Sequence, residues 1–217
     1  MAKMTITNEI LSHFSDYTVF TYRDVYLYAS KRKIKPSNLI RLLSYWNKSG
    51  KIYRISKGVY TTKKEDSLTG FAFQPFYYGL LYALTIKELW TQNAKPEIIT
   101  LKRVRQSTVP IFGSATNTIR LHHAHPRHFF GFEMVKYGNF EIPVSDNEKT
   151  LIDLFYYKIR LPIQNYSQIL VAINIKKLNK YLSFYDRHTK ITVTAFVQKY
   201  RPIAKKRQAG ESLLVNP

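Results

Sequence analysis

The chain has 217 residues, of which 45% are hydrophobic, enough for one large or two small domains with buried cores. Its 34 Lys and Arg residues against 14 Asp and Glu residues give a formal net charge of +20, which a polyanionic partner explains most simply; a generally basic proteome or a solubility role is the alternative. The sequence has no run of 18 apolar residues, no signal-peptide core at its N-terminus and no cysteine. We therefore expect a cytoplasmic protein without membrane spans, disulfides or thiolate chemistry.

The first sixty residues predict three helices followed by a hairpin. A short helix is expected over residues 5–14. A second is expected from Thr21, a good N-cap with the acidic Asp24 in the first turn, to about Lys33. Residues 31–35 then form a basic turn that leads into the third helix.

The third helix is predicted over Pro36–Lys48. Its apolar residues recur at helical spacing, Pro36 suits a first turn, and Gly50 suits the left-handed residue that ends a helix. The apolar stripe consists of Leu39, Leu42, Leu43 and Trp46. Residues 51–55 and 59–61 then predict a short basic hairpin. This order is typical of a winged helix-turn-helix, which we expect over residues 1–62.

Eleven Lys and Arg residues against three acidic residues give residues 1–62 a net charge of +8. If the apolar stripe is buried, Asn38 and Arg41 face outward, where they can hydrogen-bond adenine and guanine edges. The basic turn, the start of the helix and the hairpin are better placed for phosphates. The alternative is that these are ordinary solvated faces. The predicted DNA-contacting residues are Arg32, Lys33, Lys35, Ser37, Asn38, Arg41, Tyr45, Lys48, Arg54, Ser56 and Lys57.

A polar linker is predicted over residues 63–69, and a mixed α/β domain over residues 70–161. Ser145 and Glu148 have the spacing of a capping box, and we expect them to open a helix that carries Leu151 and Ile152. The other expected elements are a buried helix over 74–84, strands over 96–101, 108–112 and 118–122, and a hairpin over 129–135 and 140–144.

Residues 162–217 predict a helical extension with a basic tail. One amphipathic helix is expected over 166–182 with a break near Asn179, and another over 191–200, interrupted by Arg201-Pro202. Lys205-Lys206-Arg207 forms a basic cluster, and residues 208–217 are expected to fray. The fold class that follows is α/β of the α+β kind: a winged helix-turn-helix, then a mixed α/β domain.

The sequence resembles AbiEi-type antitoxins over roughly residues 6–160. Residues 20–25 and the G-x-I-x-R-I-x-K-G-x-Y pattern of 50–60 are similar to the N-terminal domain of that family. Residues 80–84 and 142–154 are similar to its second domain. One departure is that residues 85–89 replace the family's usual His-Gly-Leu element.

The resemblance implies a sequence-specific transcriptional repressor of its own operon that acts as the antitoxin of an abortive-infection, AbiE-like (type IV) toxin–antitoxin system. Its partners would be double-stranded promoter DNA and a nucleotidyltransferase-like toxin, which it counters without a stable complex. Binding as a homodimer or cooperatively on DNA stays open.

The His122–His128 segment holds four histidines in seven positions, which could bind a metal. Alternation along a strand, however, would send His122 and His123 to opposite faces. Asp146, Glu148 and Asp153 could suggest paired carboxylates, although helix capping explains their spacing better. We therefore expect no catalytic residue, metal or cofactor. The alternatives are a nucleic-acid-processing enzyme that uses His122–His128, or a nucleic-acid-binding protein unrelated to toxins.

Overall fold

The computed structural model describes residues 6–32, 34–90, 92, 94–103, 105–112, 114 and 116–209. Helices and strands combine in a mixed α+β fold, as predicted. The chain divides into two compact units: Met1–Gln74 with Thr108–Ile119, and Pro75–Ser107 with Arg120–Pro217. Among the described helices, none has the length and apolarity needed to span a membrane.

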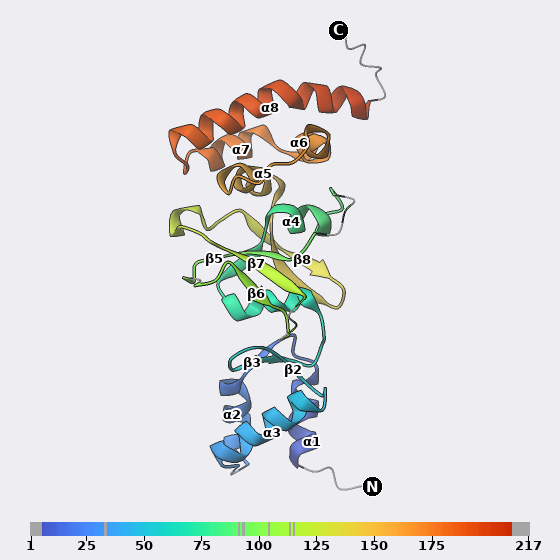
Figure 1. Ribbon diagram of the computed structural model, residues 1–217, viewed down its shortest axis with the longest axis vertical. Helices are drawn as coiled ribbons and strands as arrows, with labels where there is room; N and C mark the ends of the chain where they lie inside the picture. Colours follow the sequence, from blue (N-terminus) through green and yellow to red (C-terminus); the bar gives the residue numbers. More distant parts are fainter. Residues whose placement is uncertain are drawn as a thin grey trace. The chain divides into compact units, whose positions relative to one another are not determined.

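The first unit is a winged helix-turn-helix. It contains helices α1 (Ile6–Ser15), α2 (Tyr22–Ser30) and α3 (Pro36–Lys48), and strands β1 (Phe20–Thr21), β2 (Tyr53–Ser56) and β3 (Val59–Thr61) (Figure 1). The strands form an antiparallel sheet in the order β1-β3-β2. The predicted order of helices and hairpin is therefore confirmed, and the bounds predicted for α3 match.

Local signals in the sequence set the ends of these elements. Thr21 and Asp24 form a reciprocal capping box at the start of α2, with the Asp24 carboxylate accepting from the Thr21 backbone N–H at 2.7 Å. Gly50 and Gly58 have φ of +71° and +78°, a conformation that favours glycine. Leu39, Leu43 and Trp46 pack into the core of this unit, with Ile10, Phe14, Phe20, Val25, Ala29 and Ile52.

Two features of the first unit differ from the prediction. The two-residue β1, too short to leave a periodic pattern, was not predicted, although it completes the sheet. The residues predicted as a linker, 63–69, run into a 3-10 helix, η1 (Asp66–Phe73), in which Leu68 is fully buried. The polar composition of 63–69 hid this buried leucine, and the chain does not become a free linker there.

The second unit is built on a mixed sheet whose strands run in the order β7-β5-β4-β9-β8. β4 is antiparallel to β5 and parallel to β9, and β5 is parallel to β7. β8 and β9 form an antiparallel hairpin around Gly138, as predicted. The bounds are β4 Phe76–Tyr78, β5 Glu97–Thr100, β7 Thr118–His123, β8 Phe132–Tyr137 and β9 Phe140–Ser145. Strand β6 (Thr108–Pro110) and the start of β7 are counted with the first unit.

The helix predicted over residues 74–84 is wrong in its first half. Phe76–Tyr78 is the central strand β4, and only Leu80–Ile86 forms a helix, α4. A short apolar run does not distinguish a buried strand from a buried helix by its periodicity. The backbone separates the two elements at Gly79, which is extended, and Leu80, which has φ of +56°.

Helices α5 (Asn147–Tyr156), α6 (Ser167–Ala172), α7 (Ile175–Leu182) and α8 (Arg187–Gln208) gather at one end of the second unit, where α8 lies across α6 and α7 (Figure 1). Short 3-10 turns, η2 (Pro126–His128) and η3 (Ile163–Tyr166), lie between the regular elements.

The helix predicted over 166–182 breaks at Ile173-Asn174, where Asn174 caps α7, and not near Asn179. The predicted interruption at Arg201-Pro202 is also wrong, because α8 continues through Pro202. Packing explains this continuity: Arg201 bonds to α6 and Ala204 is buried. Fraying was predicted over residues 208–217, and residues 210–217 lie outside the described part of the chain.

The N-terminus of α5 is capped one residue later than predicted. Asp146, rather than Ser145, accepts the Lys149 N–H at 2.8 Å, and Ser145 instead bonds to Thr150. Glu148 accepts the Asn174 N–H at 2.6 Å and contacts Lys177 at 3.2 Å. Asp146 also contacts Lys177, at 3.1 Å, so both acidic side chains join α5 to α7.

A buried ion pair lies at the centre of the second unit. Lys149 and Asp153, each about 1% exposed, pair one helical turn apart on α5. The Tyr77 hydroxyl donates to Asp153 at 2.9 Å, and the Lys149 ammonium donates to the Tyr185 hydroxyl at 2.8 Å. Burial raises the pKa of Asp153 and lowers that of Lys149, and their mutual attraction opposes both shifts. The cluster therefore links β4, α5 and the segment between α7 and α8 that contains Tyr185.

Lys149→Met should lower the free energy of unfolding by about 3–5 kcal/mol at neutral pH, since it leaves Asp153 as an uncompensated buried charge. The folded-state pKa of Asp153 would then lie still further above its ordinary value near 3.8. The loss relative to wild type should thus be smallest below about pH 4 and grow as the pH rises toward the folded-state pKa. Urea denaturation followed by circular dichroism at several pH values measures it.

Lys180→Met, which removes an exposed lysine of α7, is the matched control and should change stability by less than about 0.5 kcal/mol. A loss in Lys149→Met that does not depend on pH would contradict the role assigned to the buried charge.

Candidate nucleic-acid interface

The sequence from Val25 to Lys64 contains no acidic residue. Over these forty positions it carries eleven Lys and Arg residues. In the structure the stretch covers most of α2, all of α3 and the β2–β3 hairpin, which we call the wing. No carboxylate from this segment therefore neutralises its positive charge. The positive electrostatic potentials of the cations on α2, α3 and the wing add together.

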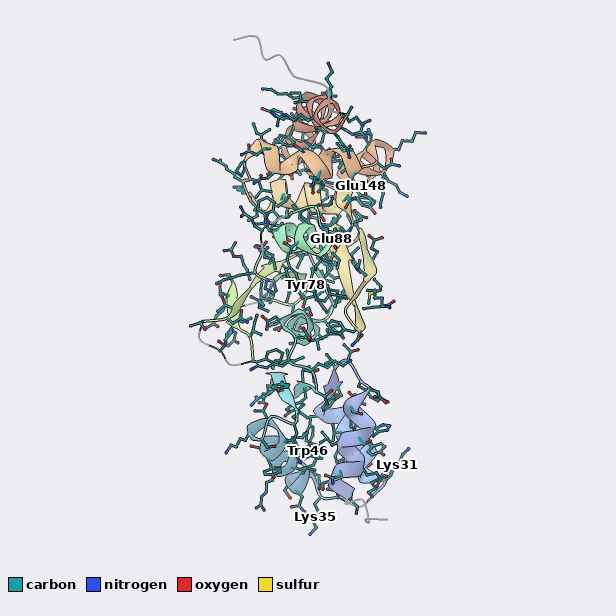
Figure 2. All side chains as sticks on the ribbon, turned by 90° about the vertical axis from the view of Figure 1, so that its right-hand side faces the viewer. Lys31, Lys35, Trp46, Tyr78, Glu88 and Glu148 are labelled. Atoms are coloured by element: carbon teal, nitrogen blue, oxygen red, sulfur yellow. The ribbon has the colours of Figure 1, made fainter. Side chains whose placement is uncertain are left out.

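The N-terminus of α3 concentrates positive charge. Its N-cap is Lys35, which is exposed and makes no side-chain cap hydrogen bond, and the first turn holds no acidic residue. Among the described helices, α2, α5, α7 and α8 begin with a side-chain oxygen cap, from Thr21, Asp146, Asn174 and Asp186. Helices α4 and α6 begin without one, as α3 does, but neither has a cation at its N-cap. Figure 2 shows Lys31 and Lys35 extending outward from the first unit, whereas Trp46 lies inside it. A lysine beside the positive end of a helix dipole is unfavourable for folding and favourable for binding an anion.

The outward face of α3 is polar. Successive helical residues are rotated by about 100°. Opposite the buried Leu39, Leu43 and Trp46 lie the exposed Ser37, Arg41, Ser44 and Lys48. Asn38 and Tyr45 lie on one flank of this face, and Ile40, 58% exposed, lies on the other. Within the described part of the chain, the Asn38 and Arg41 side chains are held by no hydrogen bond or ion pair.

The prediction placed Asn38 and Tyr45 with the outward residues and omitted Ser44 and Ile40. The structure puts Arg41 at the centre of the face and Asn38 at its edge. A rotation of about 100° per residue places Ser44 opposite Leu39 and Leu43, so the sequence alone was enough to predict that Ser44 faces outward.

The wing is joined to the helices at two points. The Asn47 side-chain oxygen, from the last turn of α3, accepts the Arg54 backbone N–H of β2 at 2.9 Å. At the other end, the Gly58 carbonyl accepts the Tyr22 N–H of α2 at 2.8 Å. Arg54 and Lys57 are exposed, and Ser56 is half-buried. Sequence reasoning missed Asn47, whose exposed position gave no signal of a structural role.

The structure does not leave Arg32 free for DNA. Its guanidinium hydrogen-bonds to Glu9 of α1 and lies 4.0 Å from the centre of the Tyr28 ring. The hydrogen bond from Arg32 lowers the pKa of the Glu9 carboxyl. The prediction could not anticipate this partner, which is 23 positions away, and we leave Arg32 out of the interface. Lys33 lies outside the described residues.

The histidines of the 122–128 segment separate in the structure. His122 is half-buried, 3.6 Å from Glu97 and so beyond hydrogen-bond reach, whereas His123 is exposed. His125 caps η2, and His128 stacks on Tyr185 with ring centres 4.2 Å apart. Burial lowers the pKa of His128. Among the described residues, no three His, Asp or Glu side chains converge as metal ligands would.

Comparisons with known proteins do not assign the chain. No protein-family model matches it, and a search of curated proteins gave no match. The resemblance to AbiEi-type antitoxins therefore rests on the residues of this sequence alone, and the geometry of the first unit has to carry the functional argument.

Lys35→Ser should raise the free energy of unfolding by about 1 kcal/mol, because it supplies a side-chain cap and removes a cation from the positive end of α3. Urea denaturation measures the change. Lys51→Ser, at an exposed position outside the regular elements, is the matched control and should be neutral within about 0.5 kcal/mol. A stability that is unchanged or lowered in Lys35→Ser would show that Lys35 is not held against the helix dipole.

Proposed function

We propose that the chain is a sequence-specific DNA-binding repressor that docks α3 in the major groove. The observation that carries the proposal is the start of α3, where an exposed lysine stands at the N-cap, no side chain caps the helix and the first turn holds no acidic residue. Such an arrangement costs folding free energy and is compensated when a phosphate binds there. Duplex DNA presents phosphates at regular spacing beside a groove wide enough for a helix.

Base recognition falls to the exposed face of α3. Arg41 can donate two hydrogen bonds to guanine, and Asn38 can pair with adenine on the flank. The absence of intramolecular partners for both side chains in the described structure leaves their hydrogen-bonding capacity available. Ser37, Ser44, Tyr45 and Lys48 complete this surface.

Phosphate contacts fall to Lys35, Arg54, Ser56 and Lys57. Because Asn47 and Tyr22 attach the wing to α3 and α2, its cations stay at a fixed distance from the base-reading face. Such contacts position the protein without reading sequence.

An antitoxin role is a second part of the proposal, and the residues that resemble AbiEi-type antitoxins support it. The structure gives two of these residues, Lys149 and Asp153, a place in the buried cluster of the second unit. They are therefore fold-determining residues here. The toxin would be a nucleotidyltransferase countered without a stable complex. The cytoplasm is the compartment where both DNA and such a toxin are found.

Arg41→Ala and Lys57→Ala should separate the two kinds of contact. Arg41→Ala should cost about 1–3 kcal/mol on the operator and relax selectivity at one base pair, since it removes a base contact. Lys57→Ala should weaken specific and random duplexes alike and reduce the salt slope by about 1, since it removes a phosphate contact. Gel-shift titration on an operator selected from random duplexes measures both.

For the three cations proposed to contact phosphates, Lys35, Arg54 and Lys57, the wild-type slope of log K against log salt should be about −2.7, a loss of about fortyfold from about 50 to 200 mM salt. Arg23→Ala, at an exposed cation of α2 outside the proposed interface, is the control. Salt-independent binding, or none to any duplex, would refute the function. Equal losses for Arg41→Ala on specific and random DNA would refute only the role of Arg41.

The antitoxin part predicts an adjacent reading frame for a nucleotidyltransferase whose expression arrests growth. Co-expression of the full chain should restore growth, and Arg41→Ala should restore it equally, because neutralisation would not require the base-reading side chain. Growth assays in the two strains check this. A growth arrest that persists beside wild-type protein would remove the antitoxin role and leave DNA binding untouched.

A further inference from the structure

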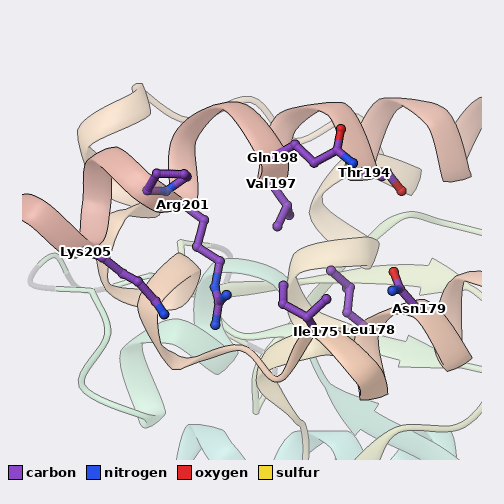
Figure 3. Close-up of a pocket in the computed structure, with 9 residues that line it drawn as sticks. Ile175, Leu178, Asn179, Thr194, Val197, Gln198, Arg201 and Lys205 are labelled. Atoms are coloured by element: carbon purple, nitrogen blue, oxygen red, sulfur yellow. The ribbon is translucent and has the colours of Figure 1, made fainter.

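A groove of about 420 Å³ lies between α7 and α8 of the second unit (Figure 3). This volume is in the range of small-molecule sites, about 300–1,000 Å³. Ile175 and Leu178 of α7 and Thr194, Val197, Arg201 and Lys205 of α8 are among the residues that line it.

The floor of the groove is aliphatic. Ile175 and Leu178 rise from α7 toward Val197 of α8 (Figure 3), and Leu178 and Val197 are only 2% and 5% exposed. No aromatic side chain is among the lining residues, so the groove lacks the stacking surface that nucleic-acid bases use. Such a floor fits a saturated hydrocarbon chain.

One end of the groove is cationic. Arg201 and Lys205 lie four residues apart on α8, hence on the same face, and both extend into the space below that helix (Figure 3). Arg201 donates from Nε to the Leu170 carbonyl at 3.0 Å and from Nη2 to the Ile173 carbonyl at 3.1 Å. These bonds hold the guanidinium in place and use two of its five N–H groups.

The charge around the groove excludes a cationic ligand. Residues 154–209 contain twelve Lys and Arg residues and one acidic residue, Asp186. The Asp186 carboxylate is occupied as the cap of α8, where it accepts the Thr189 N–H at 2.9 Å. No acidic side chain lines the groove.

We propose that this groove binds a small aliphatic carboxylate. Its hydrocarbon chain lies on Ile175, Leu178 and Val197, and its carboxylate is bound by Arg201 and Lys205. The fixed guanidinium is a preorganised partner for a planar carboxylate. The site lies wholly in the second unit and does not depend on the proposed DNA binding.

Calorimetric titration of the full chain with octanoate, butyrate and octylamine tests the ligand class. Octanoate should bind with one site, and about tenfold or more tightly than butyrate, because its four extra methylenes are buried. Octylamine, with the same number of carbon atoms and the opposite charge, should not bind. Absence of octanoate binding, or equal affinity for octanoate and octylamine, overturns the proposal.

Two matched pairs of variants locate the site. Lys205→Met should weaken octanoate binding about threefold to tenfold, whereas Lys206→Met, at an exposed neighbour outside the groove lining, should not. Thr194→Phe should fill the groove and abolish binding, whereas Ala195→Phe, at the exposed next position, should preserve it.

If the two variants of either pair bind octanoate with equal affinity, the proposed location of the site is overturned. If octanoate fails to bind and both lysine variants weaken duplex DNA binding alike, the basic face of α8 is a phosphate surface, and the carboxylate proposal is overturned.

Discussion

The scarcity of acidic side chains is the constraint on which the rest of this structure depends. The chain has only fourteen Asp and Glu residues against 34 Lys and Arg. Most of the Asp and Glu residues in the described part of the chain make contacts that stabilise the fold. Glu9 pairs with Arg32, Asp24 caps α2, and Asp153 neutralises the buried Lys149. Because the acids are used to join elements, the remaining cations are left exposed where no carboxylate is near. The positive surface of the first unit is thus a consequence of how the few negative charges are distributed.

Short-range signals made much of the fold predictable. The bounds of α3 follow from Pro36, the apolar stripe and Gly50, and the start of α2 follows from Thr21 and Asp24. The β8–β9 hairpin follows from alternation around Gly138. In each case the residues that determine where the helix or hairpin begins and ends are close together in the sequence. The local pattern of residues is therefore enough to predict the element.

Three of the failed predictions share one cause, which is a partner distant in sequence. Phe76–Tyr78 is a strand because β5 and β9 flank it, and its apolar run alone fits a helix equally well. α8 passes through Pro202 because Arg201 bonds to α6. For the interface, composition identified the exposed cations, but Arg32 was misassigned because Glu9 lies 23 positions before it.

The two hydrogen bonds that attach the wing, from Arg54 to Asn47 and from Tyr22 to Gly58, have a mechanical consequence. They hold α3 and the wing at a set spacing, so any difference between that spacing and the one an undistorted duplex offers would be taken up by deforming the DNA. The cost of that deformation depends on the stiffness of the base steps between the two contacts. Selectivity would then extend to base pairs that no side chain touches, and it would be encoded in the stiffness of the DNA.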